Sequence, residues 1–205
     1  MSRQIEISLL VEGIVDELVV RKIVGEIGGY SIGPVYKYSQ PIFRKKVQAY
    51  NNAARHFPWL AVMDMDRFNG CPGDLARAVL STPAKNMVFR IAVHEIESWI
   101  MADAKALSDF LKIDKRQVPD DTDSIEDAKQ SLIGLARKSS SSIIREKLVP
   151  RQGSTSSVGS GYTACITELM EEHWSLSRSI RECRSASLNS AYRRLELFRK
   201  NFQSR

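Results

Sequence analysis

The segment Trp59-Leu60-Ala61-Val62-Met63-Asp64-Met65-Asp66 decides the fold, because an apolar run passes directly into two acidic residues. Two other segments have the same form: residues 5–11 precede Glu12 and Gly13, and residues 87–93 precede His94, Glu95 and Glu97. Runs that are apolar almost throughout are typical of strands buried on both faces of a parallel sheet. In an open α/β sheet, ligands bind outside the carboxyl ends of the strands. We therefore expect four or five carboxylates to meet at one edge of the sheet.

Strand and helix patterns alternate over the first 110 residues. Strands are expected at residues 5–11, 31–36, 59–64 and 87–93, with helices at 14–26, 40–56, 74–80 and 95–111. Pro34 interrupts the second strand and favours a place near the edge of the sheet, and Asp74 is a plausible N-cap for the third helix. The alternation predicts an α/β fold, with an open, mainly parallel sheet of about four strands flanked by helices.

The pattern changes after residue 112. Helices are expected at residues 125–137, 163–172 and 188–201, with stretches rich in Ser and Gly at 139–142 and 151–161. These stretches are either linkers or a mobile loop near a site, since compact domains seldom hold long loops without structure. We therefore predict a core over residues 1–112 and a helical C-terminal extension over residues 113–205 that packs on it.

The bulk properties are those of a folded globular chain. A length of 205 residues with 43% hydrophobic residues indicates one domain with a small extension. No apolar run approaches the roughly 18–20 residues that cross a bilayer, and the polar start Met1-Ser2-Arg3-Gln4 is not a signal peptide. These features predict a cytoplasmic protein with no membrane contact. Cys71, Cys165 and Cys183 show no Cys-x-x-Cys pattern, so we expect reduced, mostly packed thiols.

The net charge of +6 is concentrated at the C-terminus. Residues 178–205 carry eight basic residues against Glu182 and Glu196, whereas the first 177 residues are balanced. The eight are Arg178, Arg181, Arg184, Arg193, Arg194, Arg199, Lys200 and Arg205. Basic tails of this kind favour polyanions, so we expect Arg193, Arg194, Arg199 and Lys200 to contact nucleic acid. The alternative is a solvated helix face.

Asp64 and Asp66 are the strongest candidates for metal ligands. Side chains two apart on an extended chain point to one side, and two aspartates placed so repel each other unless a cation lies between them. The alternative is an acidic turn with helix caps. Glu12 stands in a strand-to-helix turn that Gly13 permits, although alone it is also typical of a surface turn. Asp16, one helical turn further on, can face the same pocket.

The segment after the fourth strand adds further candidates. Glu97 lies on the apolar stripe of its helix and therefore faces inward, where a carboxylate needs a partner. Glu95 lies further round the helix and is the weaker candidate, and either glutamate is also favourable at a helix N-terminus. His94 is a possible general base but more often a packed histidine, and Trp99 is more typical of a core. Asp103 either orients a neighbour or is exposed.

Oxygen ligands in this number suit Mg²⁺ or Mn²⁺. The chain lacks the Gly-x-x-x-x-Gly-Lys-Ser/Thr of P-loop ATPases, the dinucleotide fingerprint Gly-x-Gly-x-x-Gly and a nucleophile elbow. His-Glu-x-x-His is also absent, because position 98 is Ser98. These patterns favour a site for Mg²⁺ or Mn²⁺ formed by Glu12, Asp16, Asp64, Asp66 and Glu97.

Glu12-Gly13 after the first strand and Asp64-x-Asp66 after the third resemble the Toprim domain of topoisomerases, primases and related nucleases. The segment from Arg90 to Asp103 is similar to a small bacterial Toprim-like family, related to the nuclease part of the overcoming-lysogenization-defect proteins. Asp16 matches the acidic residue that those nucleases carry four positions after the glutamate. Gly161-Tyr162 and the segment 187–195 resemble the helical ending of the small family.

The resemblance implies a Toprim-like catalytic core over residues 1–112 and a metal-dependent nuclease (phosphodiesterase) acting on DNA or RNA, in a family associated with phage defence. Together with the carboxylates above, it implies catalytic roles for Glu12, Asp64, Asp66 and Glu97, with Asp16 as a further metal ligand. The large relatives join this domain to an ATPase that the chain lacks, so ATPase control would need a separately encoded partner. Those nucleases also use a basic residue near the scissile phosphate, for which Lys147 and Arg151 are the available guesses. The alternatives are a non-catalytic subunit that binds nucleic acid or a partner protein, and a small-molecule phosphotransferase.

Overall fold

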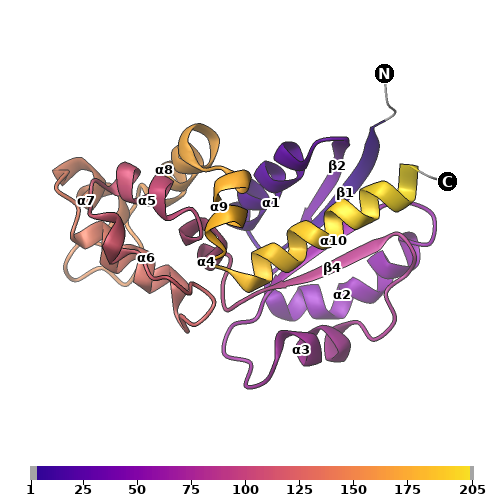
Figure 1. Cartoon of the computed structure of the whole chain (residues 1–205). Helices are drawn as coiled ribbons and strands as arrows, with labels where there is room; N and C mark the ends of the chain where they lie inside the picture. The colour runs from indigo at the N-terminus through magenta and orange to yellow at the C-terminus, as the bar shows by residue number, and fades with distance from the viewer. Residues whose placement is uncertain (1–3, 204–205) are drawn as a thin grey trace.

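Four parallel strands form one open sheet in the order β2-β1-β3-β4 (Figure 1). The structure is a computed structural model that describes residues 4–203. The strands are β1 (Ile5–Val11), β2 (Tyr30–Lys37), β3 (Trp59–Asp64) and β4 (Met87–Ala92). The α/β fold predicted from the alternating patterns is confirmed, and β2, which contains Pro34, lies at an edge.

Helices cover both faces of the sheet. One face packs on α1 (Ile14–Ile27) and α10 (Ala186–Gln203), and the other packs on α2 (Gln40–Ala53) and α3 (Pro72–Val79). Side chains of β1 alternate between these two cores, because successive residues of a strand point to opposite faces. Leu9 belongs to the core under α1, whereas Leu10 belongs to the core under α2. Burial on both faces explains why the strand sequences are apolar almost throughout.

The remaining helices lie beyond the carboxyl ends of the strands, on the left in Figure 1. They are α4 (Glu97–Met101), α5 (Ala104–Leu111), the 3₁₀ turn η1 (Lys115–Gln117), α6 (Ala128–Arg137), α7 (Ser142–Leu148), α8 (Tyr162–Glu168), the π turn η2 (Leu169–His173) and α9 (Leu176–Glu182). The chain then returns to the sheet as α10, and the Tyr30 hydroxyl donates a 2.7 Å hydrogen bond to the Leu195 carbonyl. The last helix is therefore part of the sheet's own core.

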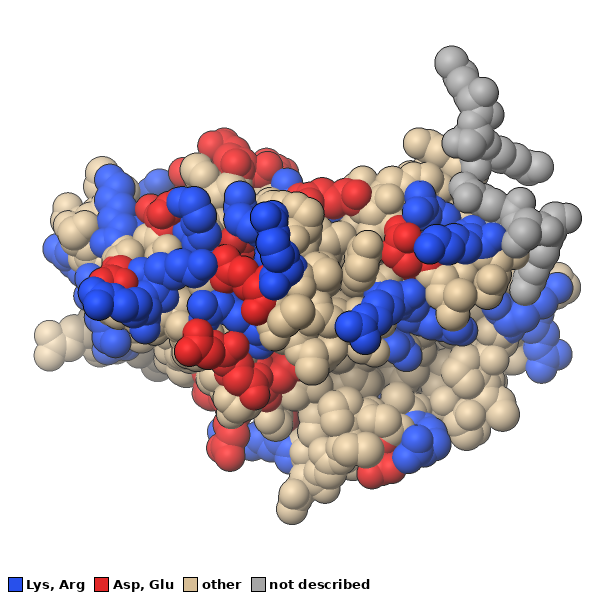
Figure 2. Space-filling model, in the orientation of Figure 1, with Lys and Arg blue, Asp and Glu red and all other residues tan. Residues whose placement is uncertain are grey.

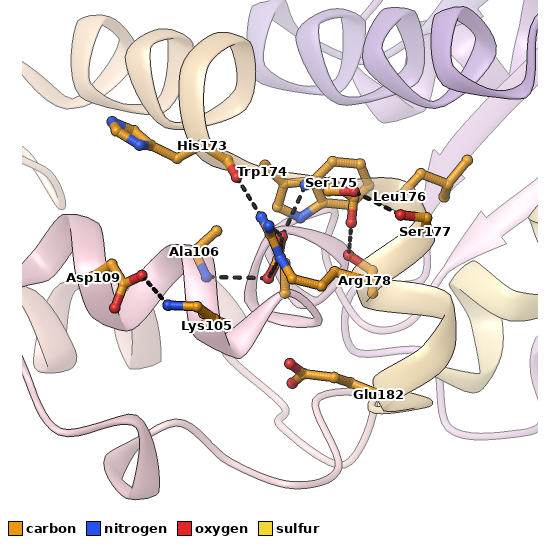
Figure 3. A network of polar contacts seen from close by, with 12 residues as sticks. Lys105, Ala106, Asp109, His173, Trp174, Ser175, Leu176, Ser177, Arg178 and Glu182 are labelled. Atoms are coloured by element: carbon orange, nitrogen blue, oxygen red, sulfur yellow. Dashed lines mark hydrogen bonds and ion pairs between the residues drawn. The ribbon is translucent and has the colours of Figure 1, made fainter.

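The expected helix over residues 95–111 is divided into α4 and α5. Asp103 stands at the break, and its carboxylate accepts a hydrogen bond from the Ala106 amide as the N-cap of α5. The same carboxylate is fully buried and accepts from the Arg178 guanidinium at 2.7 Å and from the Ser175 amide at 2.8 Å. Figure 3 shows Arg178 reaching across from α9 toward α5. Asp103 is thus buried rather than exposed, and its ion pair with Arg178 joins α5 to α9.

Three smaller expectations are corrected by the structure. Cys165 is buried, but Cys71 and Cys183 are exposed, so the thiols are not mostly packed. The N-cap of α3 is Cys71 rather than Asp74, which lies in the first turn. Helix α6 begins at Ala128 rather than Ile125, after Asp127 caps it. No helix within residues 4–203 is both long and apolar enough to cross a membrane.

Candidate functional site

The carboxyl edge of the sheet brings Glu12 and Asp64 together. Glu12 follows β1, Asp64 ends β3, and these two strands are neighbours. A Glu12 side-chain oxygen accepts a 3.0 Å hydrogen bond from the Asp64 amide. The Asp64 oxygen Oδ1 is buried and has no hydrogen-bond partner. The sequence prediction that these two carboxylates share one edge therefore agrees with the geometry.

Asp16 lies in the first turn of α1 and is only 6% exposed. Its Oδ2 accepts a 3.1 Å hydrogen bond from the Gly13 amide, whereas its Oδ1 is buried without a partner. A Cβ atom at Gly13 would stand 3.2 Å from this Oδ2. Glycine at position 13 therefore lets the Asp16 carboxylate approach the turn that follows β1 closely. This placement fits the expectation that Asp16 and Glu12 face the same pocket.

Asp66 differs from its expected placement. Strand β3 ends at Asp64, and Asp66 has a positive φ of 50°, so the alternation of an extended chain does not govern its direction. Asp66 is exposed, and its side chain accepts a 2.5 Å hydrogen bond from Gln40, which also donates to the Asp64 carbonyl at 3.2 Å. The ring atom Nδ1 of His94 lies 2.8 Å from the Asp66 carbonyl oxygen. His94 therefore positions the turn that carries Asp66.

Glu97 is 1% exposed, as its place on the apolar stripe predicted. Its Oε1 accepts a 2.7 Å hydrogen bond from the buried hydroxyl of Tyr162, at the start of α8. The Lys129 ammonium lies 3.4 Å from the same oxygen, whereas Oε2 is buried without a hydrogen-bond partner. Tyr162 and Lys129 thus fix one side of this carboxylate and leave the other side free.

Lys129 is the basic residue that the sequence analysis missed. It lies in the first turn of α6, its amide donates a 2.7 Å hydrogen bond to Glu95, and its ammonium is 3.7 Å from the same side chain. Glu95, judged the weaker candidate, is therefore a counterion of Lys129. No motif surrounds this lysine in the sequence. The proposed alternatives, Lys147 and Arg151, form no ion pair with these glutamates in the described chain.

The carboxylates raise one another's pKa values. Burial is the main cause of the strongly raised pKa of Asp64, and the negative charges of Asp16, Glu97, Glu12 and Asp66 add to it in that order. Burial also raises the pKa of Glu12, to about 7, and those of Asp16 and Glu97. Burial lowers the pKa of Lys129, but the charges of Glu97, Glu95 and Asp64 outweigh it and raise that pKa overall. The acidic edge formed by Glu12, Asp16, Asp64, Asp66 and Glu97 is therefore a site of mutual repulsion, and Lys129 is a cation in contact with it.

The acidic side chains are the right type of ligand for a divalent cation, but their present arrangement does not place enough of them around one ion. Among residues 4–203, no three His, Cys, Asp or Glu side chains stand ready to ligate one ion. Glu12, Asp16 and Asp66 each engage a local donor instead, as expected for carboxylates that repel one another. Asp16, Asp64 and Glu97 nevertheless each have a buried carboxylate oxygen without a hydrogen-bond partner, and such oxygens are suitable ligands for a divalent cation.

We expect the metal-free protein to lose stability as pH rises from about 5 to about 8. The pKa of Glu12 is raised from 4.5 to about 7, so the folded state binds more protons than the unfolded state in this window, and the free energy of unfolding falls with pH. Glu17 and Asp114 have lowered pKa values and act below this window. Urea unfolding in EDTA measures the slope, which Glu12→Gln should flatten. A rise in stability over this range would contradict the prediction.

The basic residues of the C-terminal segment are partly neutralised within the fold. Arg178 pairs with Asp103, Arg184 with Glu182 and Asp120, and Arg199 with Glu196. Lys200 lies 3.9 Å from Glu196, whereas Arg193 and Arg194 are exposed on α10. Arg205 lies outside the described residues. Figure 2 shows red as well as blue side chains along α10. The charge excess is thus a weaker indication of a polyanion surface than the sequence implied.

Comparisons of the chain with protein-family models, with curated proteins and with solved structures found no match.

Proposed function

We propose that the protein is a metal-dependent phosphodiesterase that acts on nucleic acid. The observation that carries this proposal is Asp64, whose Oδ1 is buried without a partner and whose charge interacts with those of Glu12, Asp16, Asp66 and Glu97 at the carboxyl edge of a parallel sheet. This edge is where open α/β sheets bind ligands. Such a cluster, with buried oxygens that lack partners, is stabilised by Mg²⁺ or Mn²⁺.

In the proposed site, Glu12, Asp64 and Asp66 hold one or two Mg²⁺ or Mn²⁺ ions, with Asp16 and Glu97 completing a second position. When bound, the metal supplies an activated water and offsets charge on the phosphate. Tyr162 and Lys129 orient Glu97 through its Oε1. His94 and Gln40 hold the turn that carries Asp66.

Lys129 fits the role of the cation that faces the substrate phosphate. Its ammonium lies at the acidic edge, within 4 Å of Glu95 and Glu97, and its side chain is about one-third exposed. A nucleic-acid strand is repelled by a cluster of carboxylates, so a neighbouring fixed positive charge lowers the cost of its approach. Lys129 therefore supplies the basic residue that the resemblance to Toprim nucleases calls for, in place of Lys147 or Arg151.

The test combines metal binding with cleavage. Calorimetry with Mn²⁺ should show binding to the wild type and a loss of affinity in Glu12→Gln, since loss of a first ligand removes more than the 10–100-fold typical of its supporting partners. Single- and double-stranded DNA and RNA, each assayed with Mg²⁺, Mn²⁺ or EDTA, identify the substrate. Absence of Mn²⁺ binding together with absence of cleavage on all four substrates would refute the proposal.

A second candidate is a non-catalytic module that binds nucleic acid or a partner protein. It is favoured by the observation that no three side chains in the described chain are placed to ligate a metal, while Lys129 already neutralises Glu97. Nucleic-acid binding in EDTA without any metal-dependent cleavage would support this module.

The nuclease proposal has a further part, which rests on the resemblance to Toprim nucleases. It places the enzyme in the cytoplasm, in phage defence, with a separately encoded ATPase.

The exposed residues of α10 are expected to control the salt dependence of binding. If Arg193, Arg194 and Lys200 meet phosphates, their joint replacement by Gln should weaken binding and reduce the slope of log K against log salt by about 0.7–1 per lost contact. The paired Arg199→Gln is the control within the same helix. Fluorescence anisotropy over a salt series measures both quantities. An unchanged slope in a folded triple variant would assign α10 to an ordinary solvated face.

A further inference from the structure

The stretch from the start of α6 to just beyond α7 is a second basic region of the molecule. Residues 128–151 contain six Lys or Arg residues and one acidic residue, Glu146. The preceding residues 120–127 contain five acidic residues, so the overall balance of the first 177 residues conceals this local excess. Figure 2 shows blue side chains gathered over the end of the molecule formed by α5, α6 and α7.

A hollow of about 300 Å³ lies in this region, at the C-terminal ends of α6 and α7. Its lining residues are Arg137, Arg145, Glu146, Val149, Pro150 and Arg151. The lining thus carries three guanidinium groups and the single, largely exposed carboxylate of Glu146, so an anion placed among the arginines would offset their mutual repulsion. Guanidinium groups also match the geometry of phosphate oxygens, to which they donate paired hydrogen bonds.

The arginines of this hollow have few acidic partners. Within residues 4–203, the Arg137 side chain forms no hydrogen bond or ion pair, and the acidic group paired with Arg151 is Glu146, at 4.0 Å and largely exposed. Arg145, which also lines the hollow, donates to the Ser139 carbonyl through one nitrogen of its guanidinium. These positions contrast with the paired arginines of the C-terminal segment, such as Arg178 and Arg184.

Helix α6 connects this hollow to the acidic edge. Lys129 lies in its first turn beside Glu97, and Arg137 ends it. Eight residues of α-helix separate the two side chains by about 12 Å along the axis and by about a quarter of a turn around it. A strand whose phosphodiester lies beside Lys129 therefore needs only a short stretch of backbone to reach the hollow.

We propose that the hollow lined by Arg137, Arg145 and Arg151 binds a backbone phosphate of a nucleic-acid strand that extends past the acidic edge along α6. The inference rests on the proposed function for the identity of the ligand as a nucleic-acid strand. The contacts are to phosphate alone, so they position the strand without reading its sequence. A free nucleotide offers the same phosphate chemistry, and the experiment separates the two sources.

The structural alternative is that these arginines serve the helices. Arg137 and Arg145 lie in the last turns of α6 and α7, where a positive charge favours the helix dipole. That role predicts a small loss of stability and no effect on ligand binding. Arg151 lies beyond α7 and has no such role. The variant Arg137→Gln/Arg151→Gln leaves Arg145 and its contact with Ser139 intact, and therefore separates the two explanations.

The experiment measures binding of the full chain to a labelled single-stranded oligonucleotide in EDTA, by fluorescence anisotropy. The control Arg77→Gln/Arg116→Gln removes the same charge from two exposed arginines that pair with Asp74 and Asp114 elsewhere. We expect Arg137→Gln/Arg151→Gln to raise the Kd about tenfold and to lower the salt slope by about 0.7–1, and the control to change neither. Equal effects in the two variants, or no effect in either, would overturn the proposal.

Two further measurements are needed. The first distinguishes a nucleic-acid strand from a free nucleotide, and the second tests the proposed cleavage separately from strand binding. Adenosine monophosphate and inorganic phosphate, used as competitors, should displace the strand weakly; tight, arginine-dependent binding of the mononucleotide would overturn the assignment to a strand. Wild-type cleavage of bis(p-nitrophenyl) phosphate, a diester too small to span the two places, tests the acidic edge by itself. If arginine-dependent strand binding persists without such cleavage, the inference stands and the proposed enzyme activity fails.

Discussion

Asp64→Asn is expected to abolish metal-dependent cleavage and to leave the metal-free protein at least as stable as the wild type. The substitution keeps the shape of the side chain but removes a half-buried charge that four other carboxylates repel. Burial and this repulsion raise the pKa of Asp64 strongly. Removing that charge reduces the electrostatic repulsion among the carboxylates of the folded state at neutral pH. Loss of a metal ligand should lower the cleavage rate by more than about 100-fold, since even partners of ligands cost 10–100-fold.

Two measurements test this expectation. Single-turnover cleavage with Mg²⁺ or Mn²⁺ reports the rate, and thermal unfolding in EDTA at pH 7 reports the stability. Asp109→Asn is the matched control, because Asp109 is an exposed aspartate on α5 that pairs only with Lys105 among the described residues. Full activity of Asp64→Asn would refute the ligand role, and a large drop in its stability would contradict the electrostatic account of the site.

The sequence predicts the sheet because each strand is a short apolar run with a clear end. Burial on both faces requires such runs, and in a parallel sheet their carboxyl ends share one edge. Glu12 and Asp64 could therefore be placed near each other without coordinates. Glu97 could be predicted to be buried, because the apolar stripe on which it lies is the helix face that packs against the core.

The partners of these carboxylates could not be predicted in the same way. Lys129 and Tyr162 reach Glu97 from segments 32 and 65 residues away, with no periodic pattern in the sequence around them. The positive φ of Asp66 removes it from the extended chain on which the alternation argument depends. The ion pairs of the C-terminal segment could not be predicted for a related reason, because formal charge does not reveal internal pairing such as that of Arg178 with Asp103.

Lys129→Met is expected to produce the largest loss of stability. The ammonium faces Glu97, which is 1% exposed, and Glu95. Methionine keeps much of the apolar stem but leaves these carboxylates without their cation. Breaking a buried pair by removing one partner costs about 3–5 kcal/mol. Because Lys129 is about one-third exposed, solvent screening should bring the loss nearer 2–3 kcal/mol.

The pH dependence and a second substitution identify the cause of that loss. Without Lys129, the pKa of Glu97 is raised further above its usual value, so the defect should be greatest at high pH and should shrink as pH falls and Glu97 takes up a proton. The double variant Lys129→Met/Glu97→Gln should recover much of the stability, because glutamine is neutral and still accepts the hydrogen bond from Tyr162. Urea unfolding of all four proteins completes the double-mutant cycle.

Lys105→Met is the control for this cycle, since its ion pair with Asp109 is exposed and contributes under about 1 kcal/mol. Added Mn²⁺ gives an independent reading of the same electrostatics. If the acidic edge binds the ion, a divalent charge should replace the missing ammonium, and Mn²⁺ should stabilise Lys129→Met more than it stabilises the wild type. Equal stabilisation of both proteins would mean that Lys129 and the metal do not share the field of the same carboxylates, and Lys129 would then be a helix anchor rather than part of the site.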